Sequence, residues 1–422
     1  MNIWLINSQE QIPYLNSKRR PMRMGLIAKY AAQNGHQVTW WTSTFEHVSK
    51  QFIRKEEGKE LISKNIYLYW LSSIGYSSHL SIRRFINSLF VSSRFYNKSK
   101  NAPRPDLIIV SFPIPELAFA ATRYGKLYNV PVVVDVRDWW PDALIYVVPK
   151  ILKQPAKTGI FIYRLFIDKI LQNATAITGI TQEFVAWGVK RAKRKISDLD
   201  KAFPHGYERI KNIEDNKEAN LYWDERAVKK GEQQYNIVFL GSITRSSNFD
   251  PIIRAAQFFS YYDKRVKFIF CGAGDRLPSL REKTKDICNI LINGEWVDRA
   301  KIASLLTRAF IGLVPLPDRP DFLVTINNKT IEYLSFGLPI IASPERSKVA
   351  RLARENGFGL SWDGYNSDQL INCIQKLIDS DETYNKMSRA ASTYFSENFN
   401  AEKVYSQYIK HIEQIAQAYN RT

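Results

Sequence analysis

The chain has few of the residues that build covalent or metal-bound frameworks. Its 422 residues include only 3 cysteines, Cys271, Cys288 and Cys373, and 5 histidines. The cysteines are far apart, so no pair has the spacing of a metal site or a redox motif. We therefore expect free thiols, a reducing compartment and no bound metal.

Long apolar runs are missing as well. Runs such as residues 107–112 and 160–166 fall far short of the roughly 18 to 20 residues that cross a bilayer. Residues 1–7 lack the basic start of a signal peptide and favour a first strand. A content of 45% hydrophobic and 13% aromatic residues is typical of a globular protein long enough for two domains. The sequence thus predicts a cytoplasmic protein.

Acidic residues are scarce in the first half of the chain. The net charge of +19 divides into +16 on residues 1–206 and +3 on residues 207–422. Such a basic half attracts polyanions, whether nucleic acid, anionic lipid or a pyrophosphate-bearing substrate. Composition alone does not choose among them.

Strand and helix patterns alternate twice along the chain. A polar connection over 209–234 separates the two series. Alternation of this kind predicts an α/β protein with parallel, doubly wound sheets, in which ligands bind beyond the carboxyl ends of the strands. The first series has strands at 2–7, 38–43, 66–71, 106–111, 132–135 and 176–180 with helices over 21–34 and 114–129, and the second has strands at 236–240 and 266–271 around a helix over 250–262.

The most informative stretch is residues 311–343. It predicts a buried strand, a loop, a helix of about three turns and a second strand. Asn327 and Asn328 are both N-cap types, and Gly337 suits the end of the helix. With Asn328 as the cap, residues 329–332 lie at the helix start, where unpaired N–H groups and the dipole favour an anion such as phosphate. Glu332 has a plainer explanation too, since acids near a helix start simply complement its dipole.

The string Asn328-Lys-x-Ile-Glu-Tyr-Leu-x-x-Gly-x-Pro-Ile-Ile-Ala-Ser resembles the donor-binding segment of retaining nucleotide-sugar glycosyltransferases of family 4. The resemblance implies that Glu332 holds the donor ribose. Many members carry a second Glu eight residues earlier, where this chain has Val324. The implied fold is GT-B, with two Rossmann-like doubly wound domains facing each other across a cleft. The implied reaction retains the anomeric configuration and uses a UDP-sugar with no metal and no other cofactor.

Further donor contacts are expected in two glycine-bearing turns after strands of the second half. In the family, an Arg and a Lys of the first turn neutralise the leaving diphosphate, but Ser242 and Asn248 stand in those places here. Arg245 is the only cation of this loop and is assigned that role, with Lys329 in reserve. Gly294-Glu-Trp-Val resembles the segment that holds the base. The expected donor-binding residues are Gly241, Ser242, Arg245, Gly272, Gly274, Asp275, Trp296, Val297, Asn328, Lys329, Thr330 and Glu332.

Asp135-Val-Arg-Asp-Trp-Trp-Pro-Asp follows a first-half strand and resembles a loop of bacterial enzymes that build O-antigen, capsule or exopolysaccharide. Its carboxylates and tryptophans suit a sugar hydroxyl and ring. The alternative is a charged loop in which Arg137 pairs with a neighbouring Asp. The resemblance favours Asp138 for positioning the acceptor nucleophile, so the expected catalytic set is Asp138, Arg245, Lys329 and Glu332. The expected acceptor-binding residues are Arg20, Arg23, Gly25, Arg137, Asp138, Trp139 and His205.

Two basic segments, 81–100 and 146–171, have apolar residues at helical spacing. They are either ordinary core helices with basic outer faces or helices that lie in a membrane interface. The resemblance favours the interface, which suits a polyprenyl-pyrophosphate-linked glycan acceptor at the anionic inner face of the membrane. The expected domains are 1–206 for the acceptor, 207–395 for the donor, and a C-terminal helix over 396–422 that crosses back to the first.

Two rival functions remain open. A nucleotide-sugar 2-epimerase shares the same architecture. A basic nucleic-acid-binding protein would explain the charge of the first half, but the chain has no zinc-finger, RNP or helix-turn-helix signature. We therefore expect no nucleic-acid partner.

Overall fold

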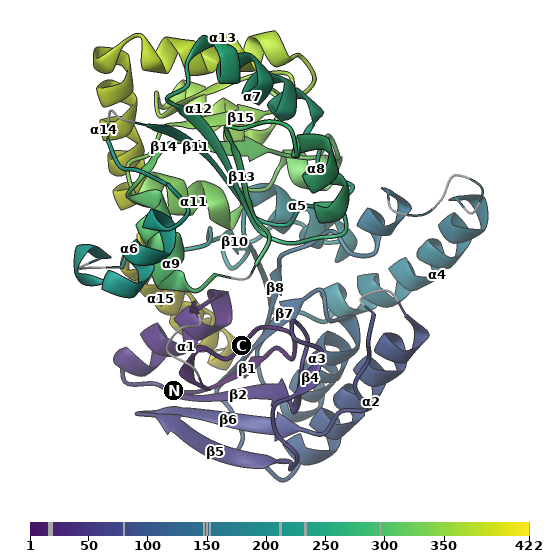
Figure 1. The fold of residues 1–422 in the computed structure, drawn as a ribbon. Helices are drawn as coiled ribbons and strands as arrows, with labels where there is room; N and C mark the ends of the chain where they lie inside the picture. The colour runs from purple at the N-terminus through teal and green to yellow at the C-terminus, as the bar shows by residue number, and fades with distance from the viewer. Residues whose placement is uncertain are drawn as a thin grey trace. The chain divides into compact units, whose positions relative to one another are not determined.

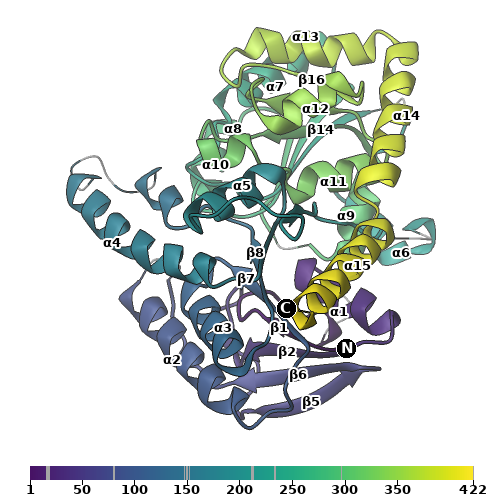
Figure 2. The same cartoon turned by 180° about the vertical axis from the view of Figure 1, so that it is seen from behind.

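The computed structural model describes residues 1–15, 20–78, 81–146, 148, 151, 153–210, 213–231, 234–295 and 297–421. They form two compact units, one made of Met1–Pro204 with Glu402–Thr422 and the other of His205–Ala401 (Figures 1 and 2). The last helix of the chain thus folds with the first unit.

The first unit is built on an eight-stranded sheet. All neighbouring strands are parallel except for the edge pair β5–β6. The strands at the centre are buried on both faces, which explains apolar runs such as that of β7. In spatial order the strands are β10 (Lys201–Ala202), β9 (Ala176–Gly179), β8 (Val132–Val136), β7 (Leu107–Phe112), β1 (Asn2–Ile6), β2 (Gln37–Ser43), β6 (Ile66–Leu71) and β5 (Gly58–Ser63). A short antiparallel pair, β3 (Phe45–Glu46) and β4 (Gln51–Phe52), stands apart.

Helices cover both faces of this sheet. α1 and α15 lie together on one face, where Tyr30 and Tyr405 stack at 5.8 Å, and α2 and α3 lie on the other (Figure 1). Trp4 of β1 packs against Phe95 of α2 and Tyr124 of α3. The helices are α1 (Arg23–Gln33), α2 (Ile82–Ser99), α3 (Pro115–Tyr128), α4 (Lys153–Gln172), α5 (Gln182–Arg191) and α15 (Ala401–Asn420), with 3-10 turns at Pro13–Leu15 and Asp142–Tyr146.

The second unit has a six-stranded, wholly parallel sheet. Two apolar clusters, one on each face, form its core. In spatial order the strands are β13 (Ile290–Asn293), β12 (Val266–Cys271), β11 (Tyr235–Leu240), β14 (Ala309–Pro315), β15 (Ile340–Ser343) and β16 (Gly359–Ser361). The helices are α6 (Lys217–Asp224), α7 (Asp250–Tyr262), α8 (Leu277–Thr284), α9 (Arg299–Leu306), α10 (Pro320–Leu323), α11 (Asn328–Ser335), α12 (Lys348–Glu355), α13 (Ser367–Ile378) and α14 (Asp381–Asn398).

The helix that carries the family-like motif differs from its prediction in two ways. Its cap is Asn327, not Asn328, because Asn327 has an extended backbone and its Oδ1 accepts the Thr330 N–H at 3.0 Å. It is also shorter than the predicted three turns, since α11 ends at Ser335 and Gly337 follows with a φ of 68°. The basic segment predicted over 146–171 begins its helix only at Lys153.

None of the helices within the described ranges combines the length and the apolar character needed to span a bilayer.

Candidate functional site

The two glycine-bearing turns of the second unit touch each other through their backbones. Gly241 follows β11 with a φ of 134°, and Gly272 follows β12 with a φ of 154°. A Cβ on Gly272 would lie 1.9 Å from the Gly241 oxygen, and one on Gly274 would lie 2.2 Å from the oxygen of Ile243. Only glycine permits this approach. The two turns therefore form one backbone edge at the carboxyl ends of neighbouring strands.

The first turn of α11 reaches this edge through Lys329. A Cβ on Gly241 would lie 3.0 Å from Lys329 Nζ, which sits 3.9 Å from the centre of the Phe239 ring. Removal from water lowers the pKa of Lys329 to about 7, against the opposing charge of Glu332. The Lys329 amine therefore changes between its charged and neutral forms near neutral pH. An anion bound beside it would favour the charged form.

Tyr333 fixes the position of α11 on the sheet. Its hydroxyl accepts the Leu240 N–H at 2.7 Å and donates to the Val238 oxygen at 3.1 Å. Gly312 of β14 makes room for the ring, since a Cβ there would lie 2.3 Å from Tyr333 Cδ2. Tyr333 and Gly312 were not singled out from sequence. Both backbone groups that the Tyr333 hydroxyl contacts belong to strand β11, and Gly241 follows directly after this strand.

The other α11 residues have clear places. Glu332 is 5% exposed, so its carboxylate lies inside the fold rather than on an outer helix face. The Thr330 hydroxyl donates to Asn327 Oδ1 at 2.8 Å and belongs to the helix cap. Asn328 is half-buried at the first helical position. The structure therefore brings Gly241, Lys329 and Glu332 to one end of the sheet.

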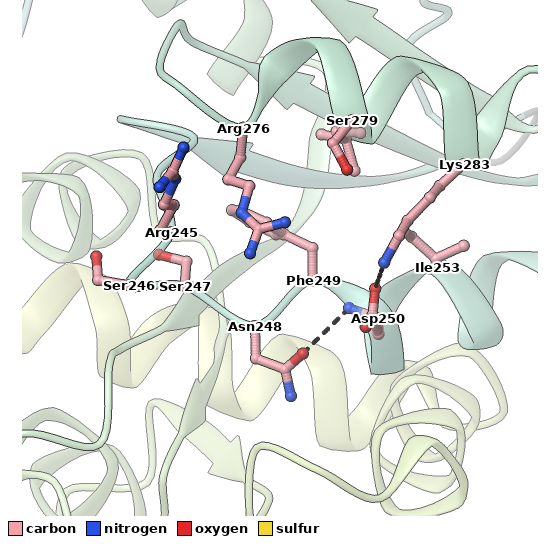
Figure 3. Close-up of a pocket in the computed structure, with 11 residues that line it drawn as sticks. Arg245, Ser246, Ser247, Asn248, Phe249, Asp250, Ile253, Arg276, Ser279 and Lys283 are labelled. Carbon is pink, nitrogen blue, oxygen red and sulfur yellow. Dashed lines mark hydrogen bonds and ion pairs between the residues drawn. The ribbon is translucent and has the colours of Figure 1, made fainter. Parts of the chain in front are cut away.

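Arg245 occupies a different environment. Its side chain is 79% exposed and its Nε pairs with Asp275 Oδ2 at 3.1 Å. It lines a cavity of about 240 Å³ between its own loop and α8, and Figure 3 shows Arg276 reaching into the same space. Lys329 and Glu332 are not among the residues lining this cavity. Arg276 is a second cation here that sequence reasoning missed.

The remaining residues expected to bind the donor differ in how exposed they are. Ser242 is exposed, as are Gly274 and Asp275. Val297 has its side chain in the core of the unit, so a contact with a ligand would have to come from its backbone. Trp296 lies outside the described residues.

In the first unit, Asp135 is the centre of a buried ion-pair network. Its carboxylate receives two hydrogen bonds from Arg23, both 2.8 Å, and one of 3.0 Å from Arg137 Nε. The Thr178 hydroxyl donates to it as well, at 2.8 Å. Burial opposes ionisation, but the charges of Arg23 and Arg137 outweigh it and hold the pKa of Asp135 well below its usual range. Asp135 is thus structural.

This network corrects the acceptor-binding role expected of Arg23 and Gly25. Arg23 is 2% exposed and also donates to the oxygens of Phe203 and Pro204, so its guanidinium is enclosed by protein. Gly25 lies within α1, where a Cβ would be 3.0 Å from Pro13 Cγ, and its N–H donates to Glu10 at 2.9 Å.

Arg137 takes the local alternative, pairing with its neighbour Asp135 and with Glu10 at 3.0 Å. No sequence pattern indicated Glu10, because it meets Arg137 only through the fold. Arg20 and His205 are half-buried, and His205 begins the second unit.

The structure separates the three carboxylates of the Asp135–Asp142 loop. Asp142 is held by Arg164 and Arg191, each at 2.6 Å, and by the Trp187 indole N–H at 2.9 Å. The Trp139 ring packs against Phe184 with centroids 5.8 Å apart. Asp138 instead lines a cavity of about 250 Å³ at the carboxyl ends of β7 and β8. Of the three carboxylates, Asp138 is the one that lines this cavity.

Comparison with known proteins agrees with this architecture. Residues 234–380 match the family described as "Glycosyl transferases group 1". This segment is therefore similar to group 1 glycosyltransferase domains. No curated protein matches the chain significantly.

Solved structures match over nearly the whole chain. Sucrose-phosphate synthase from Thermosynechococcus elongatus has a TM-score of 0.70 at 15% identity, covering 99% of both chains. Alr3699/HepE of Anabaena in complex with UDP has a TM-score of 0.67 at 12% identity, covering 98% of this chain and 100% of that one. α,α-Trehalose 6-phosphate synthase from Burkholderia multivorans has a TM-score of 0.69 at 11% identity, covering 99% of both. The GT-B fold predicted from the sequence is confirmed.

Proposed function

We propose that the protein transfers a sugar from a UDP-sugar to a hydroxyl group of an acceptor, with retention of anomeric configuration and without a metal. The observation that carries the proposal is the meeting of Lys329 with the Gly241 turn, in a segment that matches the group 1 glycosyltransferase family. A cation, a glycine turn and a helix start at the carboxyl ends of parallel strands suit a diphosphate.

Each donor group has a chemical partner in the second unit. The diphosphate is assigned to the backbone of the Gly241 and Gly272 turns and to Lys329. The buried Glu332 suits the ribose hydroxyls, because a carboxylate accepts hydrogen bonds from vicinal hydroxyls. The backbone at Val297 is assigned to the base, together with Trp296. Arg245, in the loop that follows Gly241, keeps its assignment as a further cation for the diphosphate. The HepE structure supports a uridine nucleotide, since it was solved with UDP.

The reaction breaks the bond between the anomeric carbon and the diphosphate oxygen, and the electron pair leaves on the diphosphate. The acceptor oxygen forms the new bond to that carbon, and its proton ends on the released UDP. Positive charge at the departing oxygen lowers the barrier most, because charge develops there in the transition state. Protonated Lys329 supplies that charge. Asp138 is assigned to hold the acceptor hydroxyl.

The acceptor is proposed to be a polyprenyl-pyrophosphate-linked glycan of a bacterial surface polysaccharide, met at the inner membrane face. The observation in favour is that α2 and α4, besides burying one set of apolar residues in the core, expose a second set, which an ordinary core helix does not. Ile82 of α2 is 80% exposed and Ile162 of α4 is 64% exposed. The exposed apolar residues are Ile82, Phe85, Ile86, Leu89 and Phe90 on α2 and Phe161, Ile162 and Leu165 on α4.

Basic side chains accompany these apolar ones. Arg83 on α2 and Lys153 and Lys157 on α4 add the positive charge that attracts anionic lipid. An amphipathic helix whose apolar face is open and whose flanks are basic suits the boundary between lipid headgroups and acyl chains. We call the exposed apolar residues of α2 and α4 together the apolar surface.

A panel of nucleotide sugars tested by thermal shift examines the donor assignment directly. We expect a UDP-sugar to raise the melting temperature of the wild type and to have a weaker effect on Lys329→Gln. If no nucleotide sugar stabilises the protein, the proposal fails. Product analysis of the stabilising sugar without acceptor then tests the 2-epimerase alternative, which predicts an epimerised sugar, while transfer predicts none.

A further inference from the structure

The cavity that Asp138 lines has residues that the assigned reaction does not yet use. It lies at the carboxyl ends of β7 and β8, beside the first turn of α3, with α2 and α4 contributing to its walls. Its walls include Arg84, Phe85, Glu116, Trp140 and Tyr163 as well as Asp138. All of these residues belong to the first unit. The cavity therefore has three aromatic side chains, one cationic group and two carboxyl groups.

Glu116 and Tyr163 form a hydrogen-bonded pair in this cavity. The Tyr163 hydroxyl, carried by α4, donates to Glu116 Oε1 at 2.6 Å. Glu116 is only 6% exposed, and no salt bridge to it occurs in the described part of the chain. Burial raises the pKa of its carboxyl, while the Tyr163 hydrogen bond, a hydrogen bond from its own backbone N–H and the charge of Arg84 oppose that shift. Burial and the neighbouring Glu116 also raise the pKa of Tyr163.

A buried carboxyl group without an ion pair is costly in a purely structural position. At the wall of a cavity such a carboxyl group can accept a further hydrogen bond from a ligand hydroxyl, because each carboxyl oxygen has two lone pairs. Tyr163 holds one of these oxygens and so orients the group. Such a preorganised acceptor distinguishes a ligand with a hydroxyl from one without it more sharply than an apolar wall does.

We propose that Glu116, oriented by Tyr163, binds a hydroxyl of the acceptor sugar in this cavity. The proposal rests on the proposed function and specifies its acceptor side. Trp140 offers an indole ring for the sugar face, and Arg84 offers charge for the diphosphate of a lipid carrier. Phe85 both lines the cavity and belongs to the apolar surface, so we assign it to the first contact with a prenyl chain attached to that diphosphate.

The test is direct binding of farnesyl diphosphate N-acetylglucosamine, a short prenyl-linked sugar, to the full-length protein. Glu116→Gln keeps the shape of the side chain but replaces a carboxylate oxygen with an amide, and Tyr163→Phe removes only the orienting hydroxyl. We expect a loss of affinity of about tenfold or more for Glu116→Gln, the range for a hydrogen bond to a charged group, and a smaller loss for Tyr163→Phe. Glu183→Gln is the matched control, since Glu183 also lies in the first turn of a first-unit helix but not at the cavity.

Donor binding by the same variants separates this proposal from the proposed function. UDP-sugar affinity, which depends on the second unit, should be unchanged in both variants, and this also shows that the variants remain folded. If Glu116→Gln does not fold, Tyr163→Phe alone decides. Unchanged affinity of a folded variant for the prenyl-linked sugar overturns the assignment, as does failure of the wild type to bind it. Failure of the wild type to bind any nucleotide sugar overturns the proposed function instead.

Discussion

Lys329 Nζ packs directly against Gly241, so closely that a Cβ on the glycine would lie 3.0 Å from it. One residue comes from the start of α11 and the other from the end of β11. The contact brings the start of α11 next to the glycine turn after β11, and the donor assignment requires both of these. It also keeps the Lys329 amine largely away from water. Both consequences can be measured.

Gly241→Ala should weaken UDP binding, because the new Cβ displaces the Lys329 amine and the φ of 134° strains any other residue. Strain of this kind costs about 1 to 3 kcal/mol. Isothermal titration with UDP and thermal unfolding together measure the two effects. Gly357→Ala is the control, since Gly357 also has positive φ but has nothing within 4 Å of the added Cβ. Equal effects of the two variants on UDP binding would contradict the prediction.

UDP affinity should fall as pH rises above about 7. The free protein loses the Lys329 proton there, because burial lowers the pKa of the amine to about 7, while the bound diphosphate keeps the amine charged. Binding then takes up a proton, so affinity falls by up to about tenfold per pH unit. Titrations between pH 6 and 9 in two buffers of different ionisation enthalpy measure this uptake. Lys329→Gln should flatten the slope, whereas Lys386→Gln, at an exposed site, should keep it.

The lowered pKa of Lys329 also predicts how the stability of the folded protein depends on pH. In the unfolded chain Lys329 returns to an ordinary pKa of roughly 10.4. Between about pH 7 and that value the unfolded state binds more protons than the folded state, so this residue makes stability rise with pH across that window. Urea unfolding of the wild type and Lys329→Gln across these pH values should show the rise only in the wild type.

Glu332→Gln should weaken UDP binding about tenfold or more, because ribose hydroxyls lose a charged hydrogen-bond acceptor. Inorganic pyrophosphate has no ribose, so its affinity should not fall. Comparing the two ligands by calorimetry therefore tests the ribose assignment rather than general damage. Glu345→Gln, at an exposed position after β15, serves as the control. An equal loss of affinity for UDP and for pyrophosphate would contradict the assignment of Glu332 to the ribose.

Asp135→Asn should destabilise the protein by about 3 to 5 kcal/mol, because it leaves the buried Arg23 charge uncompensated. The side chains of both residues are fully buried, at 2.8 Å from each other. Urea denaturation measures the change. Glu282→Gln removes a partner from the exposed Lys285–Glu282 pair, at 2.7 Å, and should cost less than about 1 kcal/mol. A small effect of Asp135→Asn would show that the Arg23–Asp135 ion pair contributes little to the stability of the first unit.

Replacing Ile82, Ile86 and Leu89 together with Ser should release the protein from vesicles that contain anionic lipid. These residues are exposed on α2, so the change removes apolar contact with lipid at little cost to the core. Sedimentation with vesicles measures release, and circular dichroism checks folding. A triple change of the exposed Tyr261, Tyr262 and Tyr365 of the second unit to Ser is the control. Full retention of the α2 variant would argue against the membrane assignment.

Local patterns sufficed for much of the architecture. Alternating strand and helix signals predicted parallel sheets, and the motif around Glu332 led to the GT-B fold, which the structural matches confirm. Errors occurred at boundaries. Asn327 and Asn328 are equivalent cap types in sequence, and only the backbone conformation of Asn327 distinguishes them.

The roles of charged residues were harder to predict. Asp135, Asp138 and Asp142 lie within eight positions of each other, yet one is buried with Arg23, one lines a cavity and one is held by Arg164 and Arg191. The Arg137–Asp135 pair is local, but Arg23, Arg164 and Arg191 lie more than 20 positions from the aspartates that they pair with. Spacing along the chain carries no information about such pairs.

The sequence by itself determined the alternation of strands and helices and the two glycine turns, because these depend on neighbours a few residues apart. Tertiary structure decided which groups meet: Lys329 with Gly241, Arg23 with Asp135, and Glu116 with Tyr163. Tertiary structure also decided that the α2 residues of the apolar surface are exposed to solvent. Burial and partner choice are properties of packing, and packing joins segments that the sequence keeps far apart.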